Sequence, residues 1–252
     1  MPSAISDKPI RAILFDLFGT VINFTPGVPG IQAATSEWRA AMHWLQETAE
    51  RELPQIHFDD LLTALMEVTQ AIVRDRPPEY REISSRERFR RALLQLGIDA
   101  GRAPGLAERL SLAHMSFLAS TTVLPSAHLE VLRQLAPRFR LGLISNFDHG
   151  PTARCILADH GIGGFFAAIV ISDDFGRRKP HPAIFVAALR ELGVTVEDAL
   201  FVGDSVSDDV IGGQNAGLKV VWLNAKRHAL APDVKPPEHE IADLSELPAL
   251  LD

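Results

Sequence analysis

The sequence predicts an α/β protein built on a doubly wound parallel sheet, with a helical cap domain inserted after the first strand. Three observations lead to this prediction. Short apolar runs recur and mostly end on a polar residue or a glycine, helical patterns separate the later runs, and about a hundred residues after the first run lack them. Alternating strands and helices form right-handed crossovers, which make the strands parallel and cover both faces of the sheet.

The first predicted strand covers residues 11–16 (RAILFD), and the turn-forming pair Gly19-Thr20 follows it. Similar apolar runs predict further strands, and helical patterns occupy most of the intervals between them. The strands are residues 141–145, 168–172, 200–203 and 220–223, and the helices are residues 127–135, 152–160, 181–192 and 205–216. Because reactive groups gather at the carboxyl ends of strands in such sheets, a site is expected there.

The inserted segment behaves differently from the rest of the chain. It is rich in helix formers, and its apolar residues recur at helical spacing, as in Leu61, Leu65 and Val68. We therefore expect residues 22–123 to form the helical cap domain and residues 1–21 and 124–252 to form the core. A proline-rich surface loop at residues 231–237 is expected to precede a final strand and helix.

Composition narrows the functional classes. The 252 residues carry a net charge of −7 with no basic run, which argues against a nucleic-acid partner. The N-terminus lacks a signal-peptide pattern, and no run of about 18 apolar residues could cross a bilayer, so a cytoplasmic protein without a membrane partner is expected. The single cysteine, Cys155, excludes an intrachain disulfide and argues against a cysteine-built metal site. The expected partner is a small-molecule substrate, and the oligomeric state stays open.

Polar residues stand at four predicted strand ends or in the loops beside them. Each has an ordinary explanation when it is taken alone, such as a turn, a helix cap or a solvated charge. Their occurrence together and in this order favours a shared site instead. They are Asp16 in DLFGT, Ser145-Asn146 in LISNFD, Lys179 in RRKPHP, and Asp204, Asp208 and Asp209 in VGDSVSDD.

In these motifs the sequence resembles the haloacid dehalogenase superfamily of hydrolases, which use an aspartate nucleophile. The resemblance covers roughly residues 10–22 and 124–225 and implies a Rossmann-like core. It implies that Asp16 is the nucleophile, that Lys179 is the cation beside it and that Thr20 anchors the loop. It also implies that Ser145, with Asn146 beside it, binds the phosphate.

The charges of the acidic motif support a bound metal. Asp16, Asp204 and Asp209 total −3, and a phosphate adds about −2, which Lys179 alone cannot balance. Mg²⁺ held by Asp16, Asp204 and the main-chain carbonyl of Phe18 would offset two more of these charges, and it suits the site because Mg²⁺ prefers oxygen ligands. We assign Asp209 to the same metal site, and Mg²⁺ is the expected cofactor.

Phe18 departs from the phosphatase pattern, which usually has a second aspartate at this position as general acid and base. A phenyl ring cannot transfer a proton. This keeps 2-haloacid dehalogenation open as an alternative, because a halide leaves through an aspartyl ester without protonation and without Mg²⁺. Trp38-Arg39 also resembles the tryptophan–arginine pair with which dehalogenases bind the substrate carboxylate, so Arg39 is a candidate substrate-binding residue.

Other residues argue against the alternatives. Dehalogenases replace the first acid of the last motif, whereas Asp204 and Asp209 are both present here. A phosphonatase would need a cap lysine, and residues 22–123 contain none. We therefore expect a Mg²⁺-dependent hydrolase of a small phosphorylated metabolite that works through an aspartyl-phosphate. Dehalogenation is second, and a weakly active or non-catalytic protein that binds a phosphorylated ligand is third. His149 is expected to cap the next helix or to face solvent at its start.

Overall fold

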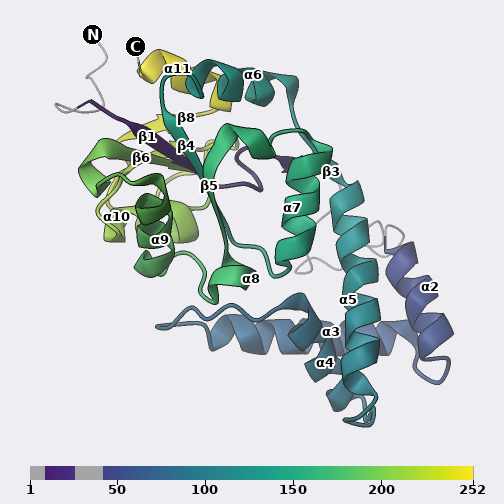
Figure 1. Cartoon of the computed structure of the whole chain (residues 1–252). Helices are drawn as coiled ribbons and strands as arrows, with labels where there is room; N and C mark the ends of the chain where they lie inside the picture. The colour runs from purple at the N-terminus through teal and green to yellow at the C-terminus, as the bar shows by residue number, and fades with distance from the viewer. Residues whose placement is uncertain (1–8, 26–41, 252) are drawn as a thin grey trace.

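The computed structural model describes residues 9–25 and 42–251. A six-stranded sheet has the order β5-β4-β1-β6-β7-β8, and each neighbouring pair in it runs parallel. A separate antiparallel pair joins β2 and β3. Figure 1 shows the sheet in the upper part of the molecule and helices α2 to α5 below and beside it.

The secondary-structure elements have the following bounds. The strands are β1 (Ala12–Phe15), β2 (Asn23–Phe24), β3 (Thr122–Val123), β4 (Arg140–Ser145), β5 (Phe166–Ile171), β6 (Ala199–Gly203), β7 (Lys219–Leu223) and β8 (His239–Ile241). The α-helices are α2 (His43–Glu52), α3 (Phe58–Arg74), α4 (Ser85–Gln95), α5 (Ala103–Ser120), α6 (Ser126–Leu135), α7 (Gly150–Asp159), α8 (Ser172–Phe175), α9 (Pro182–Leu192), α10 (Ile211–Asn215) and α11 (Leu247–Leu250). Short 3₁₀ turns are η1 (Gly163–Phe165), η2 (Val196–Asp198) and η4 (Leu244–Glu246), and η3 (Val206–Val210) is a π-helical turn.

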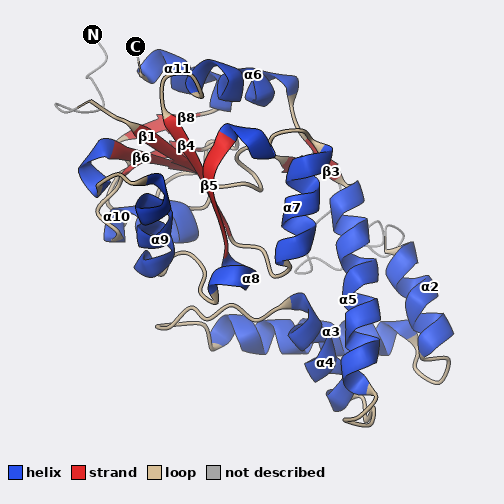
Figure 2. Cartoon of the chain, viewed as in Figure 1, coloured by secondary structure: helices blue, strands red, loops and turns tan. Residues whose placement is uncertain are grey.

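The central strand β1 explains why the apolar runs are continuous. All four of its residues are buried, because helices cover both faces of the sheet (Figure 2). Successive side chains point to opposite faces, so Ile13 and Phe15 join one hydrophobic cluster, which includes Leu132 of α6. Leu14 joins the other cluster, with Phe185 of α9. The predicted doubly wound α/β fold is confirmed.

The predicted elements differ from the observed ones mainly at their ends. The strand predicted at residues 168–172 begins at Phe166 and ends at Ile171, and Ser172 already starts α8. The helix predicted over residues 205–216 is divided into the π-helical turn η3 and the short helix α10. Strands β2 and β3 were not predicted, because each has only two residues and carries no periodic pattern.

Helices α2 to α5 have a hydrophobic core of their own. Its buried residues come from all four helices, for example Leu45, Leu65, Leu93 and Leu110, and none of them belongs to the clusters of the sheet. The pairing of β2 with β3 brings the two ends of this inserted segment together. The domain boundaries at residues 21–22 and 123–124 stay a prediction. Among the described residues, no helix has the length and apolar character needed to cross a membrane.

Candidate active site

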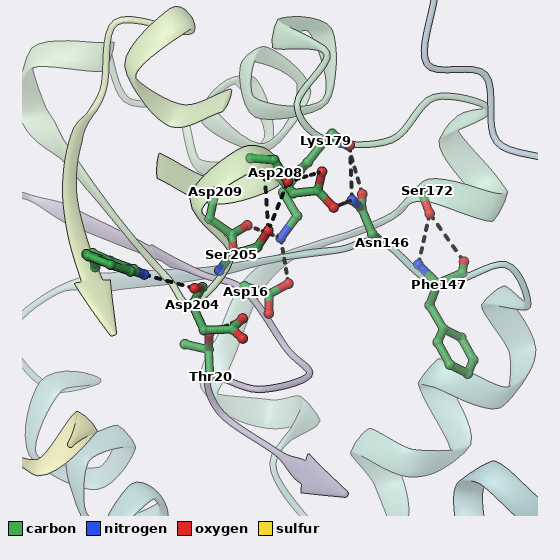
Figure 3. A network of polar contacts seen from close by, with 12 residues as sticks. Asp16, Thr20, Asn146, Phe147, Ser172, Lys179, Asp204, Ser205, Asp208 and Asp209 are labelled. Atoms are coloured by element: carbon green, nitrogen blue, oxygen red, sulfur yellow. Dashed lines mark hydrogen bonds and ion pairs between the residues drawn. The ribbon is translucent and has the colours of Figure 1, made fainter. Parts of the chain in front are cut away.

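The candidate residues meet at the carboxyl end of the sheet. Asp16 directly follows β1, Ser145 ends β4 and Asp204 directly follows β6, and these three strands are neighbours. Strand β1 lies between β4, which is followed by β5 on one side of the sheet, and β6, which is followed by β7 on the other side. Open α/β sheets form their binding crevices at such a point, where the strand order reverses. Lys179 reaches the same place from the loop between α8 and α9 (Figure 3).

Lys179 lies between two carboxylates. Its Nζ is 2.5 Å from Oδ1 of Asp16 and 2.7 Å from Oδ1 of Asp209. The side chains of Lys179 and Asp209 are 1% exposed, and that of Asp16 is 9% exposed. The main-chain N–H of Ser205 donates to the other oxygen of Asp209 at 2.9 Å, which fixes that carboxylate. The nucleophile candidate and its cation therefore form a buried, well-defined pair.

Asp204 is held close to the loop that follows β1. The Thr20 hydroxyl donates to its Oδ1 at 3.5 Å, and the Trp222 indole donates to its main-chain carbonyl at 2.9 Å. Gly19 has a φ of +94°, and a Cβ there would lie 2.6 Å from Oδ2 of Asp204. A larger residue than glycine would clash, so this loop can approach the carboxylate only with Gly19.

Three carboxylates form a potential cation site. One oxygen each of Asp16, Asp204 and Asp209 lies within 4.8 Å of the others. Hard oxygen donors at this spacing suit Mg²⁺, which retains several of its waters. The residues present therefore fit the metal that the sequence predicts, and the part of Phe18 in this site stays a prediction.

Burial and mutual repulsion shift the pKa values of these groups. Burial raises the pKa of Asp16 to about 8, Lys179 opposes this, and Asp209 and Asp204 add to it. Burial also raises the pKa of Asp204 to about 6, with Asp209 as the next cause. For Lys179, burial by itself would lower the pKa, but Asp16 and Asp209 outweigh it and raise the pKa above its ordinary value. A divalent cation would relieve this crowding of negative charge.

Ser145 and Asn146 have different surroundings. The Asn146 side chain accepts from the main-chain N–H of Lys179 at 2.8 Å and donates to its carbonyl at 3.1 Å. It also donates to Asp208 at 3.0 Å. Ser145 is fully buried, and its hydroxyl has no hydrogen-bond partner in the described part of the chain. Leaving a buried hydroxyl unpaired destabilises the folded protein by about 1–3 kcal/mol, so this hydroxyl is a candidate to bind a polar ligand.

Phe18 lies in an aromatic stack. Its ring centroid is 5.1 Å from that of Phe24 and 4.9 Å from that of Phe147. The position where many phosphatases have an acid is therefore packed with rings. His149 accepts a hydrogen bond from the Thr152 N–H at 3.3 Å and caps α7, as expected.

The structure brings most of the predicted site residues together: Asp16, Thr20, Ser145, Asn146, Lys179, Asp204 and Asp209. Arg39 and its neighbour Trp38 fall outside the described residues. The roles of all these residues stay predictions. Two contacts of the site were not predicted, that of Phe147 with Phe18 and that of Asp208 with Asn146. Phe147 and Asp208 lie inside the motifs LISNFD and VGDSVSDD, so their positions beside Asn146 and Asp209 in the sequence were the available signal.

Comparison with known proteins identifies the family of this chain. A family model for haloacid dehalogenase-like hydrolases matches residues 10–217. The pyrimidine 5′-nucleotidase YjjG of Escherichia coli is 32% identical over 169 residues, which cover 64% of this chain and 74% of that protein. The crystal structure of a 2-haloacid dehalogenase from Pseudomonas syringae superposes with a TM-score of 0.74 at 28% identity and covers 96% of this chain and 98% of that one.

A third similarity is local. The glyceraldehyde 3-phosphate phosphatase of Pyrococcus furiosus is 40% identical over 88 residues. The match spans 36% of that protein's length and 35% of this chain. This chain is thus similar in sequence to phosphatases and in structure to a dehalogenase, and these similarities do not choose between the two activities.

Proposed function

Because this chain belongs to the haloacid dehalogenase-like hydrolases, we propose that it hydrolyses a small phosphorylated metabolite with Asp16 as nucleophile and Mg²⁺ as cofactor. The observation that carries this proposal is the set of three carboxylates within 4.8 Å of one another, with Lys179 between two of them. A site for a carboxylate substrate would not gather this much negative charge, because like charges repel.

The residues divide the reaction between them. Asp16 attacks phosphorus, the bond to the leaving oxygen breaks, and an aspartyl-phosphate forms; water then cleaves this intermediate and regenerates Asp16. Lys179 offsets the charge of the attacking carboxylate, and the free hydroxyl of Ser145 donates to a phosphate oxygen. Asp16, Asp204, Asp209 and the Phe18 carbonyl would hold Mg²⁺, which offsets the charge of the phosphate.

Two observations favour 2-haloacid dehalogenation as a second candidate. Phe18 offers no proton for a leaving group, and the dehalogenase of Pseudomonas syringae resembles this chain over nearly its full length. In that reaction Asp16 would displace a halide and form an aspartyl ester, which water would cleave. A third possibility is a protein that keeps the fold and binds a phosphorylated ligand with little or no turnover.

A turnover screen separates these candidates. Phosphate esters and 2-haloacids would be supplied with Mg²⁺ or with a chelator, and release of phosphate or halide would be measured. We expect phosphate release that needs Mg²⁺. Halide release that persists with chelator would replace the proposal by the dehalogenase function, and stable binding of a phosphate ester without release would support the third possibility.

The matched variant for this screen is Asp16→Asn. The amide has the shape of the carboxylate but is no nucleophile, so turnover should fall to background while the unfolding temperature stays within a few degrees of the parent. Turnover near the parental rate in Asp16→Asn would contradict the central assignment.

A further inference from the structure

Glu82 is a buried carboxylate in the connection between α3 and α4. Its side chain is 2% exposed, and Nη1 of Arg178 lies 3.1 Å from both of its oxygens. The hydroxyl of Ser172 donates to it at 2.5 Å. The main chain adds two hydrogen bonds, from Glu82 to the carbonyl of Gly176 at 3.0 Å and from Arg178 to the carbonyl of Tyr80 at 2.9 Å. This connection is therefore fastened to the loop that leads to Lys179.

The two side-chain partners of Glu82, Arg178 and Ser172, lie next to the two segments that meet where Asn146 contacts Lys179. Arg178 directly precedes Lys179 in the chain. Ser172 accepts from the main-chain N–H of Phe147 at 2.9 Å, and Phe147 directly follows Asn146 (Figure 3). The Asn146 side chain in turn grips the main chain of Lys179. The carboxylate of Glu82 thus holds together the two segments whose contact places Lys179.

The charge of Glu82 is also needed where it lies. Burial lowers the pKa of Arg76 and nearby Arg178 lowers it further, whereas Glu82 opposes both effects most strongly, followed by Asp208 and Asp148. Glu82 therefore offsets two guanidinium groups that repel each other, and Arg178 is itself only 14% exposed. Without the carboxylate, Arg178 would be left buried with an unbalanced charge, and it would move toward solvent.

We propose that Glu82 is a positioning residue, which couples the inserted helical segment to the placement of Lys179 against Asp16. The inference rests on the proposed function only in that turnover uses this pair, which holds for phosphate esters and for 2-haloacids alike. Glu82 itself is not expected to contact the substrate.

The first test compares two carboxylates of the same connection. Glu82→Gln keeps an acceptor for Ser172 but removes the charge that binds Arg178. Glu79→Gln is the matched control, because Glu79 forms an exposed ion pair with Arg177 at 2.9 Å. For Glu82→Gln we expect kcat to fall by about tenfold to a hundredfold, since small misplacements of reacting groups have effects of this size, with less than a threefold change in KM. Glu79→Gln should match the parent in both.

The second test asks whether Glu82 acts through Lys179. Asn146→Ala removes the side chain that grips the Lys179 main chain, so it should act at the same point. The double variant Glu82→Gln/Asn146→Ala should then lose about as much kcat as the more damaging single change. Losses that multiply would show independent actions and overturn the proposal.

A readout without substrate completes the design. The amides of Phe147 and Lys179 donate within this network, so their hydrogen exchange should accelerate in Glu82→Gln and stay unchanged in Glu79→Gln. If hydrogen exchange accelerated in Glu82→Gln while kcat stayed at the parental value, Glu82 would stabilise the local structure only, and the positioning role would be refuted. If Glu82→Gln does not fold, Ser172→Ala replaces it, because it removes the hydrogen bond to Glu82. Its kcat and its hydrogen exchange would be measured in the same way. Turnover of 2-haloacids but of no phosphate ester would overturn the proposed function and still allow every comparison above.

Discussion

At the scale of the residue, Phe18 should shape the kinetics most. It stands two positions after the nucleophile candidate, where the sequence pattern of many phosphatases places a general acid and base. Its ring packs against the rings of Phe24 and Phe147, and none of these three side chains can donate a proton. The first step of the proposed reaction must then expel its leaving group without a proton from Phe18.

We therefore predict a steep dependence of the first step on the leaving group. General acid assistance is typically worth about 10²–10⁴ in rate, so acyl and aryl phosphates should react far faster than alkyl esters. The aspartyl-phosphate should also accumulate, because the base that would activate water is missing. The measurement is the rate of the first step across esters of graded leaving-group pKa. A flat dependence would show that another side chain supplies the proton.

The same stack limits what Phe18→Asp can restore. The new carboxylate would leave Phe24 and Phe147 without their ring partner, and such contacts contribute about 0.5–1.5 kcal/mol each beyond buried area. We expect a lower unfolding temperature and only a partial gain in alkyl-ester turnover. A variant as stable as the parent would mean that the aromatic stack contributes little to the fold.

Single residues of the site could be predicted from the sequence when their neighbours along the chain identified them. Asp16, Lys179 and Asp204 each stand in a short motif beside a strand end, so the sheet topology brings them together. Glu82 and Ser172 could not be predicted, because their contact joins positions 90 residues apart and neither lies in a motif. Only the packing of the inserted segment on the core creates it.

At the scale of the element, apolar spacing predicted the core strands and most core helices close to their observed bounds, and the helix predicted over residues 205–216 is the exception. The region after β6 shows why. Gly212 and Gly213 pack tightly, since a Cβ would lie 2.9 Å from Cα of Pro180 in the first case and 2.8 Å from a methyl of Val220 in the second. The π-helical turn before them carries Asp209. π turns of this kind often mark functional sites, and apolar spacing does not reveal them.

The packing of α5 on α4 depends on a histidine that must stay neutral. His114 is 1% exposed, its ring lies 5.9 Å from that of Phe89, and its Nδ1 has no partner among the described residues. Burial lowers the pKa of His114 to about 3, and nearby Arg88 adds to this. In the unfolded chain the pKa is about 6.5, so below that pH the unfolded state binds the proton and the folded state does not.

We predict that His114 makes the protein less stable in acid. Its contribution is fully present above pH 6.5 and is lost as the pH falls toward 3, by at most about 1.4 kcal/mol per pH unit. The free energy of unfolding would be measured at pH 7.5 and pH 5.5 for the parent and for His114→Leu. The parent should lose about 1 kcal/mol more than the variant over this range. An equal loss in both proteins would exclude His114 as the cause.

At the scale of the whole molecule, the proposed metal site links function to stability. The folded protein without metal holds three carboxylates against one ammonium group. The pKa values of Asp16 and Asp204 are raised, so the folded state binds protons more tightly than the unfolded state. Stability without metal should therefore fall as the pH rises from about 4 through 6 and toward 8. The site is arranged for a cation at the expense of the metal-free fold.

Mg²⁺ should accordingly stabilise the whole protein. At a hundred times its Kd a ligand adds about 2.7 kcal/mol, which corresponds to about 5–10 °C in unfolding temperature for a chain of this size. The shift should be larger at pH 8 than at pH 6, because fewer protons compete for Asp204 and Asp16. Asp204→Asn should abolish the shift, and it should also raise the unfolding temperature without metal, since it removes one of the repelling charges. Thermal unfolding of both proteins with Mg²⁺ and with chelator measures all of these quantities. A Mg²⁺ shift in Asp204→Asn equal to that of the parent would place the cation elsewhere, because no ligand set that includes Asp204 could lose this carboxylate and keep its affinity.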